Sequence, residues 1–292
     1  MHEPDRRPFF EVPRDERIAM WEKLYDEPGF GIWLANFRDI FMDEEANAEI
    51  SAFIADKIRS RVHDPEVAEL LIPKDHGFGV QRLPLETNYF EAYNRDNVHL
   101  VSVQHTPIER ITERGLRTTE REYELDVILY ATGFDAITGA FDRIDIRGVG
   151  GQSLRELWAD GPVTSYGLQV PGFPNMLMPN GPQSASATTN FPRGIEIGVD
   201  WCTDLLQYAW ERGYSRVEAT AEAGEAWTRE VEQLYGMMLM RNAQGWFTGY
   251  NSNVPGHEKG KIRYLVYNGG TPKFRKLITA EADAGYPSVV FA

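Results

Sequence analysis

The sequence of 292 residues contains a single cysteine, Cys202, which excludes an intramolecular disulfide. Cys202 stands in an apolar, helix-like stretch, where a lone cysteine is more often a core residue than a nucleophile. No uninterrupted apolar run approaches the roughly 18 residues of a membrane span. The start of the chain, Met-His-Glu-Pro-Asp-Arg-Arg-Pro, also lacks the apolar core of a signal peptide. We therefore expect a cytoplasmic protein.

Positive charge is scarce, since 30 basic residues stand against 44 acidic ones and leave a formal net charge of -14. Binding to a phosphate backbone needs clustered lysine and arginine, so we expect no nucleic-acid partner. We expect no membrane partner either. The content of 42% hydrophobic and 12% aromatic residues is ample for a packed core, and the length suffices for two domains.

Several catalytic and binding motifs are missing. No G-x-G-x-x-G follows a predicted strand, and no phosphate-binding P-loop occurs, so the chain has no dinucleotide fingerprint of its own. The six histidines show neither H-E-x-x-H nor Cys/His ligand spacing, which leaves a metal site without support. A G-x-S-x-G nucleophile elbow is absent as well.

The first 75 residues have helical periodicity. Residues 13–25 predict a short amphipathic helix that ends before Pro28-Gly29. Asp43 begins a second helix, and Asp64-Pro65 begins a third that stops at Pro73. The predicted buried stripe of the second helix is Ala46, Ile50, Phe53, Ile54 and Ile58.

A glycine-containing loop follows, in which Gly77 and Gly79 precede Arg82. Strand-forming residues then cluster in three short segments separated by turn residues. These segments are 98–103, 108–112 and 116–119. These three segments predict a small β-meander, in which consecutive strands pair with one another.

Residues 126–135, Asp-Val-Ile-Leu-Tyr-Ala-Thr-Gly-Phe-Asp, contain a continuous apolar run that stops at Thr132 and Gly133. Such a run favours a short strand over 127–131, buried on both faces of a parallel sheet. Ligands of open α/β sheets bind at the carboxyl ends of strands, and a glycine there lets the backbone approach a ligand. A plain strand followed by a plain turn remains the alternative.

A second short buried strand is expected over 173–178, before Pro179-Asn-Gly-Pro182. The small polar segment 183–190 then leads into a helix from about Pro192, which predicts a ligand cradle or an ordinary connection. The apolar residues expected to be buried by that helix are Ile195, Val199, Leu205 and Leu206. A later helical stripe, expected to be core, comprises Ala223, Trp227, Val231, Leu234 and Met238.

The segment 126–135 resembles the strand ending in Ala-Thr-Gly in flavin-dependent monooxygenases of the Baeyer-Villiger type. The resemblance runs from about Pro13 to the end of the chain. It includes the loop 72–83, which resembles the family's active-site arginine loop, and the segment 246–256, Trp-Phe-Thr-Gly-Tyr-Asn-Ser-Asn-Val-Pro-Gly, which resembles the loop whose tryptophan contacts the nicotinamide cofactor. Gly181-Pro182 resembles the segment bordering the flavin.

Two departures from the family pattern stand out. Gln81 takes the place of a lysine found in many members before the arginine, which weakens the expected preference for the phosphorylated nicotinamide cofactor. The family's two G-x-G-x-x-G motifs and the His- and Trp-containing fingerprint between them are absent. The resemblance therefore identifies the chain as the C-terminal half of such an enzyme.

The resemblance implies an α/β fold, the C-terminal half of a flavoprotein with two dinucleotide-binding domains, preceded by a helical subdomain. Its implied divisions are a helical subdomain (1–75), part of the nicotinamide-binding domain (76–130) and part of the flavin-binding domain (131–292). The implied cofactors are FAD and NADPH, shared with the missing N-terminal half. The implied cofactor-binding residues are Gln81, Thr132, Gly133, Pro182, Gln183 and Trp246.

In the family, reduced flavin and O2 form a peroxide anion that attacks a ketone and inserts one oxygen atom, giving an ester or lactone. The resemblance assigns Arg82 as the catalytic residue, because a guanidinium is always charged and suits an oxyanion. Three interpretations remain: a monooxygenase half that works with a separate N-terminal chain, a binding module that has lost its chemistry, or a subunit that completes another chain. The alternative interpretation of Arg82 is a solvated surface arginine in a charged loop.

Overall fold

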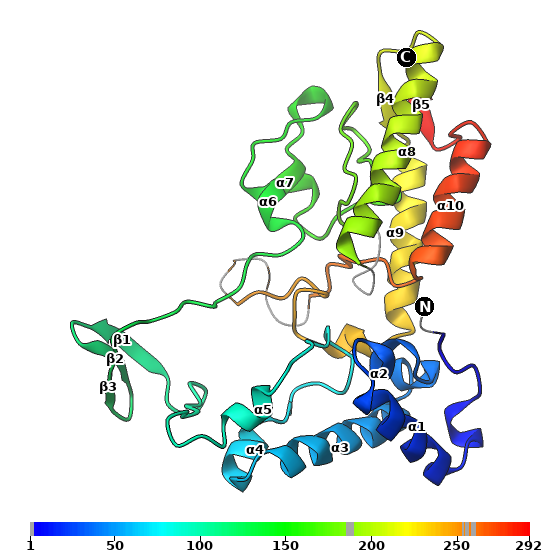
Figure 1. Cartoon of the computed structure of the whole chain (residues 1–292). Coiled ribbons are helices and arrows are strands. Elements are labelled where there is room, and N and C mark those ends of the chain that lie inside the picture. The colour runs from blue at the N-terminus through cyan, green and yellow to red at the C-terminus, as the bar shows by residue number, and fades with distance from the viewer. Residues whose placement is uncertain (1–2, 185–189, 253, 255–256, 258–260) are drawn as a thin grey trace. The chain divides into compact units, whose positions relative to one another are not determined.

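The structure, a computed structural model, describes residues 3–184, 190–252, 254, 257 and 261–292. The chain divides into two compact units. The first comprises Met1–Ile40, Glu44–Gly79 and Leu83–Gly133, and the second comprises Phe41–Asp43, Val80–Arg82 and Phe134–Ala292. Figure 1 shows helices throughout both units and short strands in each.

The helical start expected for the first 75 residues is confirmed. Its elements are η1 (Phe9–Glu11), α1 (Arg14–Asp26), α2 (Gly31–Leu34), η2 (Arg38–Phe41), α3 (Glu44–Arg61) and α4 (Pro65–Leu71). Trp21 of α1 is fully buried, and its indole N–H donates to Oδ1 of Asn36 at 3.0 Å. Helix α4 begins as its sequence predicts, because the Asp64 carboxylate accepts a hydrogen bond from the backbone N–H of Glu66 at 2.8 Å.

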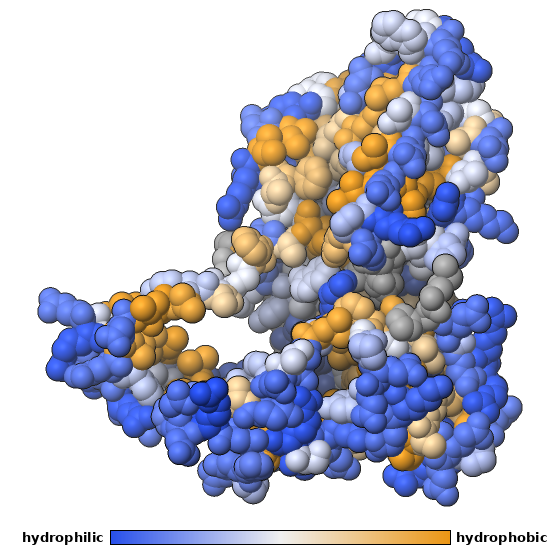
Figure 2. All heavy atoms as spheres, in the orientation of Figure 1, coloured by the Kyte–Doolittle hydropathy of each residue, from blue (hydrophilic) through white to orange (hydrophobic). Residues whose placement is uncertain are grey.

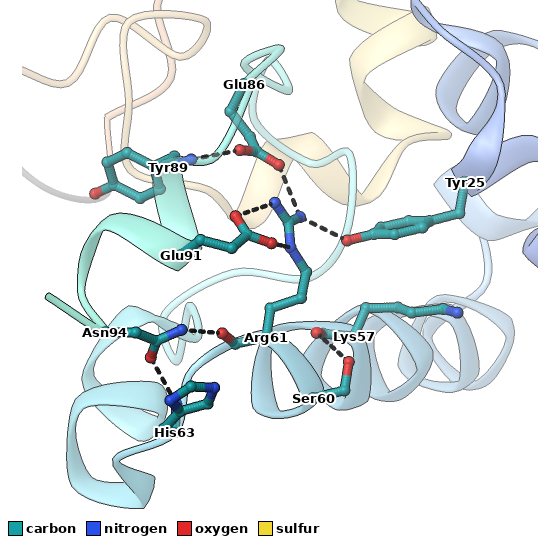
Figure 3. Close-up of polar contacts among 9 residues, drawn as sticks. All are labelled: Tyr25, Lys57, Ser60, Arg61, His63, Glu86, Tyr89, Glu91 and Asn94. Atoms are coloured by element: carbon teal, nitrogen blue, oxygen red, sulfur yellow. Dashed lines mark hydrogen bonds and ion pairs between the residues drawn. The ribbon is translucent and has the colours of Figure 1, made fainter.

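Arg61, at the end of α3, ties three parts of the first unit together (Figure 3). Its guanidinium binds the Glu91 carboxylate through Nε at 2.6 Å and Nη2 at 2.7 Å, and Nη1 donates to Glu86 at 2.7 Å and to the Tyr25 hydroxyl at 2.9 Å. Glu91 lies in α5 (Tyr89–Ala92). A bidentate guanidinium pair fixes geometry as well as charge, so it holds α5 against α3.

The predicted meander is confirmed in part. Strands β1 (Ile108–Thr112), β2 (Gly115–Thr118) and β3 (Glu122–Glu124) form an antiparallel sheet in chain order. Ile111 pairs with Leu116, and Leu116 pairs with Tyr123. The segment 98–103, expected as a further strand, forms turns and irregular backbone instead.

The buried strand expected over 127–131 is also not formed in the described structure. Val127 is 70%, Leu129 87% and Tyr130 72% exposed. A central strand needs hydrogen-bonding neighbours on both sides and covering elements on both faces, and the described residues supply neither to this segment. Its apolar side chains therefore face outward.

The second unit is organised around three long helices. Its elements are α6 (Gly139–Asp142), η3 (Val149–Gly151), α7 (Leu154–Leu157), α8 (Phe191–Glu211), β4 (Val217–Ala219), α9 (Ala221–Gly236), η4 (Leu239–Asn242), α10 (Thr271–Asp283) and β5 (Val289–Phe291). Strands β4 and β5 pair antiparallel, with Val217 opposite Phe291. The core stripe expected on α9 is confirmed at Trp227, Val231 and Leu234, which are all buried.

Two expectations for this unit fail. Residues 173–178 form no strand, because only Leu177 makes an isolated bridge, to Gln169, and Phe173 and Met178 pack in a small apolar cluster instead. Helix α8 begins as predicted, but Ile195, Val199 and Leu206 are exposed and only Leu205 of the expected four is buried. Two apolar sectors run along this helix, and periodicity alone cannot tell which one faces the core.

Cys202 belongs to that core. Its side chain is 5% exposed, and burial raises the pKa of the thiol to about 11. A thiol that stays protonated at neutral pH is a poor nucleophile, so the core interpretation of Cys202 is confirmed. None of the helices in the described residues combines the length and the apolarity that crossing a bilayer requires.

Candidate functional site

The loop that leads to Gln81 and Arg82 needs its glycines. A Cβ added at Gly77 would lie 1.8 Å from Oδ1 of Asn47, and Gly79 has a positive φ of 68°. Asn47 is buried, and its amide nitrogen donates to the carbonyl oxygens of Ile40 at 2.6 Å and Phe78 at 2.9 Å. The close approach of the loop to this amide explains why no side chain fits at position 77.

Gln81 lies beside the loop that carries Trp246, within the second unit. Its amide nitrogen donates to the carbonyl oxygen of Gln244 at 3.1 Å. Val80, Gln81 and Trp246 also border one small internal gap of about 10 Å³. A hydrogen bond therefore joins the segment of Gln81 to the loop of Trp246, although more than half of the chain separates them in sequence.

Arg82 faces the first residue of α8. Its guanidinium carbon lies 6.0 Å from the centroid of the Phe191 ring, at the outer limit of a cation–π contact. The Arg82 side chain is half-buried and Phe191 is 44% exposed. The positive charge of Arg82 thus lies next to an apolar ring, where water screens it less than on an open surface.

The Trp246 loop is held by buried hydrogen bonds from α9. The Tyr235 hydroxyl donates to the carbonyl oxygen of Phe247 at 2.6 Å and accepts from the backbone N–H of Val266 at 3.2 Å. Thr248 donates to the carbonyl oxygen of Ala243 at 3.0 Å, which closes the turn. Burial raises the pKa of Tyr235, so this hydroxyl stays protonated and keeps donating. Trp246 itself is half-buried.

Gln183 is a bonded core residue. It has a positive φ of 64° and is 1% exposed. Its Oε1 accepts from the Thr164 hydroxyl at 2.7 Å, and its Nε2 donates to the carbonyl oxygen of Pro162 at 2.8 Å. The indole N–H of Trp227 donates to its backbone oxygen at 3.1 Å. These contacts fix the shape of the Gly181–Ser184 turn, including Pro182.

A cavity of about 50 Å³ lies where these segments meet. Its lining residues are Ile137, Asn180, Gly181, Ser184, Phe191, Trp246, Leu265 and Val266. This volume suits one or two water molecules and is well below the roughly 300 Å³ of a small-molecule site. The second unit therefore brings Gln81, Arg82, Pro182, Gln183 and Trp246 into one region, with Phe191 as a residue that the sequence interpretation missed.

Thr132 and Gly133 belong to the first unit and are exposed. Gly133 has φ of 80°, and a Cβ added there would meet no atom within 4 Å. The predicted strand end thus has the backbone conformation that glycine favours, with open space beside it.

A second polar cluster was not found by sequence reasoning. Arg263 is 3% exposed, and its guanidinium donates to the carbonyl oxygen of Trp158 at 2.8 Å and contacts Nε2 of His257. Nδ1 of His257 lies 3.7 Å from an oxygen of Asp135. Burial lowers the pKa of Arg263, opposed by nearby aspartates. No spacing motif in the sequence links Asp135, His257 and Arg263.

No family model matches the chain. Individual proteins, however, match most of the chain. The chain is 44% identical over 272 residues to the 2-oxo-Δ3-4,5,5-trimethylcyclopentenylacetyl-CoA monooxygenase of Pseudomonas putida, which covers 93% of this chain and 50% of that protein. It is 40% identical to the cyclopentanone 1,2-monooxygenase of a Comamonas species, over 94% of this chain and 50% of that protein.

A solved structure is equally similar. The crystal structure of OTEMO in complex with FAD and NADP superposes with a TM-score of 0.92 at 42% identity, covering 100% of this chain and 53% of that one. The expected α/β fold class, as half of a flavoprotein, is confirmed by this match. The chain spans about half the length of the relatives it matches.

Proposed function

Since this chain is homologous to Baeyer-Villiger monooxygenases over about half of their length, we propose that it is one half of such an enzyme. Completed by the other half, it inserts one oxygen atom from O2 into a ketone to give an ester or lactone, at the expense of NADPH. The observation that carries this proposal is the match of the whole chain, at 42% identity, to a structure that contains FAD and NADP.

The described residues around Trp246 do not fit a flavin by themselves. The cavity beside Trp246 has a volume of about 50 Å³, and the sequence has no glycine-rich fingerprint for a pyrophosphate. We therefore propose that FAD and NADPH are shared with the other half. The exposed apolar segment 127–131 supports this view, because it has the composition of a buried strand and the described residues do not cover it.

Within the complete enzyme, Arg82 is the proposed catalytic residue. Its fixed positive charge beside the Phe191 ring stabilises negative charge that develops on a reacting oxygen, an interaction worth about 1.5–3 kcal/mol. Trp246 and Gln81 are proposed to contact the nicotinamide cofactor. Thr132, Gly133, Pro182 and Gln183 are proposed to border the flavin, Gln183 by holding the turn of Pro182 in shape.

We further propose the division into 1–75, 76–130 and 131–292 as helical, nicotinamide-binding and flavin-binding parts. The proposed partners are a ketone, O2 and a separate chain that supplies the N-terminal half, and the proposed location is the cytoplasm.

Reconstitution tests the proposal. The chain is co-expressed with the portion of the Pseudomonas putida relative that it does not span, and the purified complex is assayed for bound flavin and for ester or lactone formed from cyclic ketones with NADPH. We expect stoichiometric flavin and product from the complex, and neither from either half alone. A complex that binds flavin but oxidises no ketone would favour a binding module, and the absence of any complex would contradict the proposed pairing.

A further inference from the structure

Helix α8 has three faces rather than two. Successive residues of a helix are rotated by about 100°, so positions along its 21 residues can be assigned to sectors. One sector is buried and contains Gly198, Trp201 and Leu205. A second is polar. A third contains Ile195, Val199, Leu206 and Trp210, which fall within about 60° of one another.

The third sector is apolar and exposed. Ile195 is 40%, Val199 43%, Leu206 52% and Trp210 84% exposed. Figure 2 shows hydrophobic side chains gathered over α8. Scattered exposed apolar residues need no explanation, but four exposed apolar side chains in one sector of a helix, from Ile195 to Trp210, are typical of a surface that another element covers.

The exposed stripe does not pack into the core of the second unit. Gly198 lets α8 approach the 179–182 turn, since a Cβ there would lie 1.7 Å from the carbonyl oxygen of Pro179. Trp201 donates from its indole N–H to the carbonyl oxygen of Ile278 in α10 at 3.1 Å. These contacts fix the rotation of α8 about its axis. The exposed stripe therefore cannot turn inward, and it stays available to a partner.

We propose that this stripe of α8, Ile195, Val199, Leu206 and Trp210, is the surface on which the other half of the enzyme docks. The inference rests on the proposed function and adds the place of contact. The matched crystal structure contains a further portion of chain, about as long as this one, beyond the fold that the two share. A fold completed by that portion needs an apolar contact surface, and the stripe provides one on the longest helix among the described residues.

The charges beside the stripe argue against two other occupants. The polar face of α8 carries the carboxylates of Glu196, Asp200, Asp204 and Glu211, all exposed. A second copy packed on the same stripe would bring two such rows together, in chains of net charge -14. An anionic membrane surface is disfavoured for the same reason, because helices that lie on membranes carry lysine and arginine on the polar face.

The experiment compares two paired variants in the co-expression system described above. Val199→Lys with Leu206→Lys places two charges in the stripe, and Thr203→Lys with Gln207→Lys places the same two charges on the neighbouring exposed polar face of the same helix. Trp210→Ala is a third variant, chosen because a side chain that is 84% exposed can be removed without disturbing the fold. Circular dichroism and thermal unfolding of each chain alone check folding.

We expect the variant with Val199→Lys and Leu206→Lys to bind the other half at least about tenfold more weakly than the control variant with Thr203→Lys and Gln207→Lys. We expect Trp210→Ala to weaken this binding as well. Equal retention by the stripe variants and the parent, in a complex that still binds flavin, would overturn the docking surface and leave the proposed function standing. Failure of the parent to retain the other half would overturn both. A dimer of the parent alone that the stripe pair abolishes would identify a second copy as the occupant and overturn the inference.

Discussion

At the scale of single residues, Arg82 combines a permanent charge with a partly apolar setting beside Phe191. In the reconstituted enzyme, Arg82→Ala removes the stabilisation of the developing oxyanion. We expect ester or lactone formation to fall at least about tenfold and NADPH oxidation to continue as wasteful peroxide release. Chromatographic product yield and NADPH absorbance measure the two rates. An unchanged yield would remove Arg82 from the mechanism, and Arg193→Ala, at an exposed arginine of α8, is the matched control.

Gly133 tests the strand end at the same scale. A valine there has to adopt φ of 80°, which costs about 1–2 kcal/mol for a residue with a side chain. A Cβ added at this position meets no atom of the described chain within 4 Å. We expect Gly133→Val to lower flavin retention of the complex more than Gly133→Ala does. Both side chains are destabilised by the positive φ, but only valine adds bulk beyond Cβ towards a cofactor. Equal retention by the two variants would place the strand end away from the cofactors.

At the scale of elements, the Arg61 network joins α1, α3 and α5 (Figure 3). The hydrogen bonds from Arg61 lower the pKa of Glu91 from its ordinary value of 4.5 to about 2. A carboxylate with a lowered pKa in the folded state contributes stability that is fully present above pH 4.5 and is lost as the pH falls towards 2. The ion pair is exposed at Glu91, so the contribution is modest.

The matching measurement is thermal unfolding against pH. We expect Glu91→Gln to unfold at a lower temperature than the parent at pH 7, and the gap to narrow between pH 4.5 and about 2 as Glu91 of the parent is protonated. Glu232→Gln, which neutralises an exposed carboxylate of α9, is the control. A gap that stays constant across this interval would show that the Arg61–Glu91 pair does not couple the two helices.

At the scale of the whole molecule, the cavity beside Trp246 has a volume of only about 50 Å³, too small for a flavin, and the sequence contains no dinucleotide fingerprint. We expect the chain purified alone to be colourless, to retain no flavin after soaking and desalting, and to oxidise no ketone. Absorbance at the flavin bands measures this directly. Stoichiometric retained flavin would show a complete binding unit, and the proposal of a shared cofactor would have to be abandoned.

Local signals in the sequence determined much of this protein. Helix α4 begins where Asp64 and Pro65 place it, because a cap and a proline act on the adjacent turn. The hairpin of β1 and β2 forms where strand-forming residues flank a glycine. The similarity to a Baeyer-Villiger monooxygenase is also read from sequence, since it depends on the identity and order of residues along the chain.

The tertiary structure decided what depends on distant partners. Residues 127–131 have the composition of a central strand and yet are exposed, because pairing requires neighbours that local sequence does not specify. Which apolar sector of α8 is buried was settled by Gly198 and Trp201 packing on segments far along the chain. The contact of Gln81 with the Trp246 loop has the same origin. Composition and periodicity act over a few residues, whereas the packing of side chains remote in sequence selects the buried face and assembles the site.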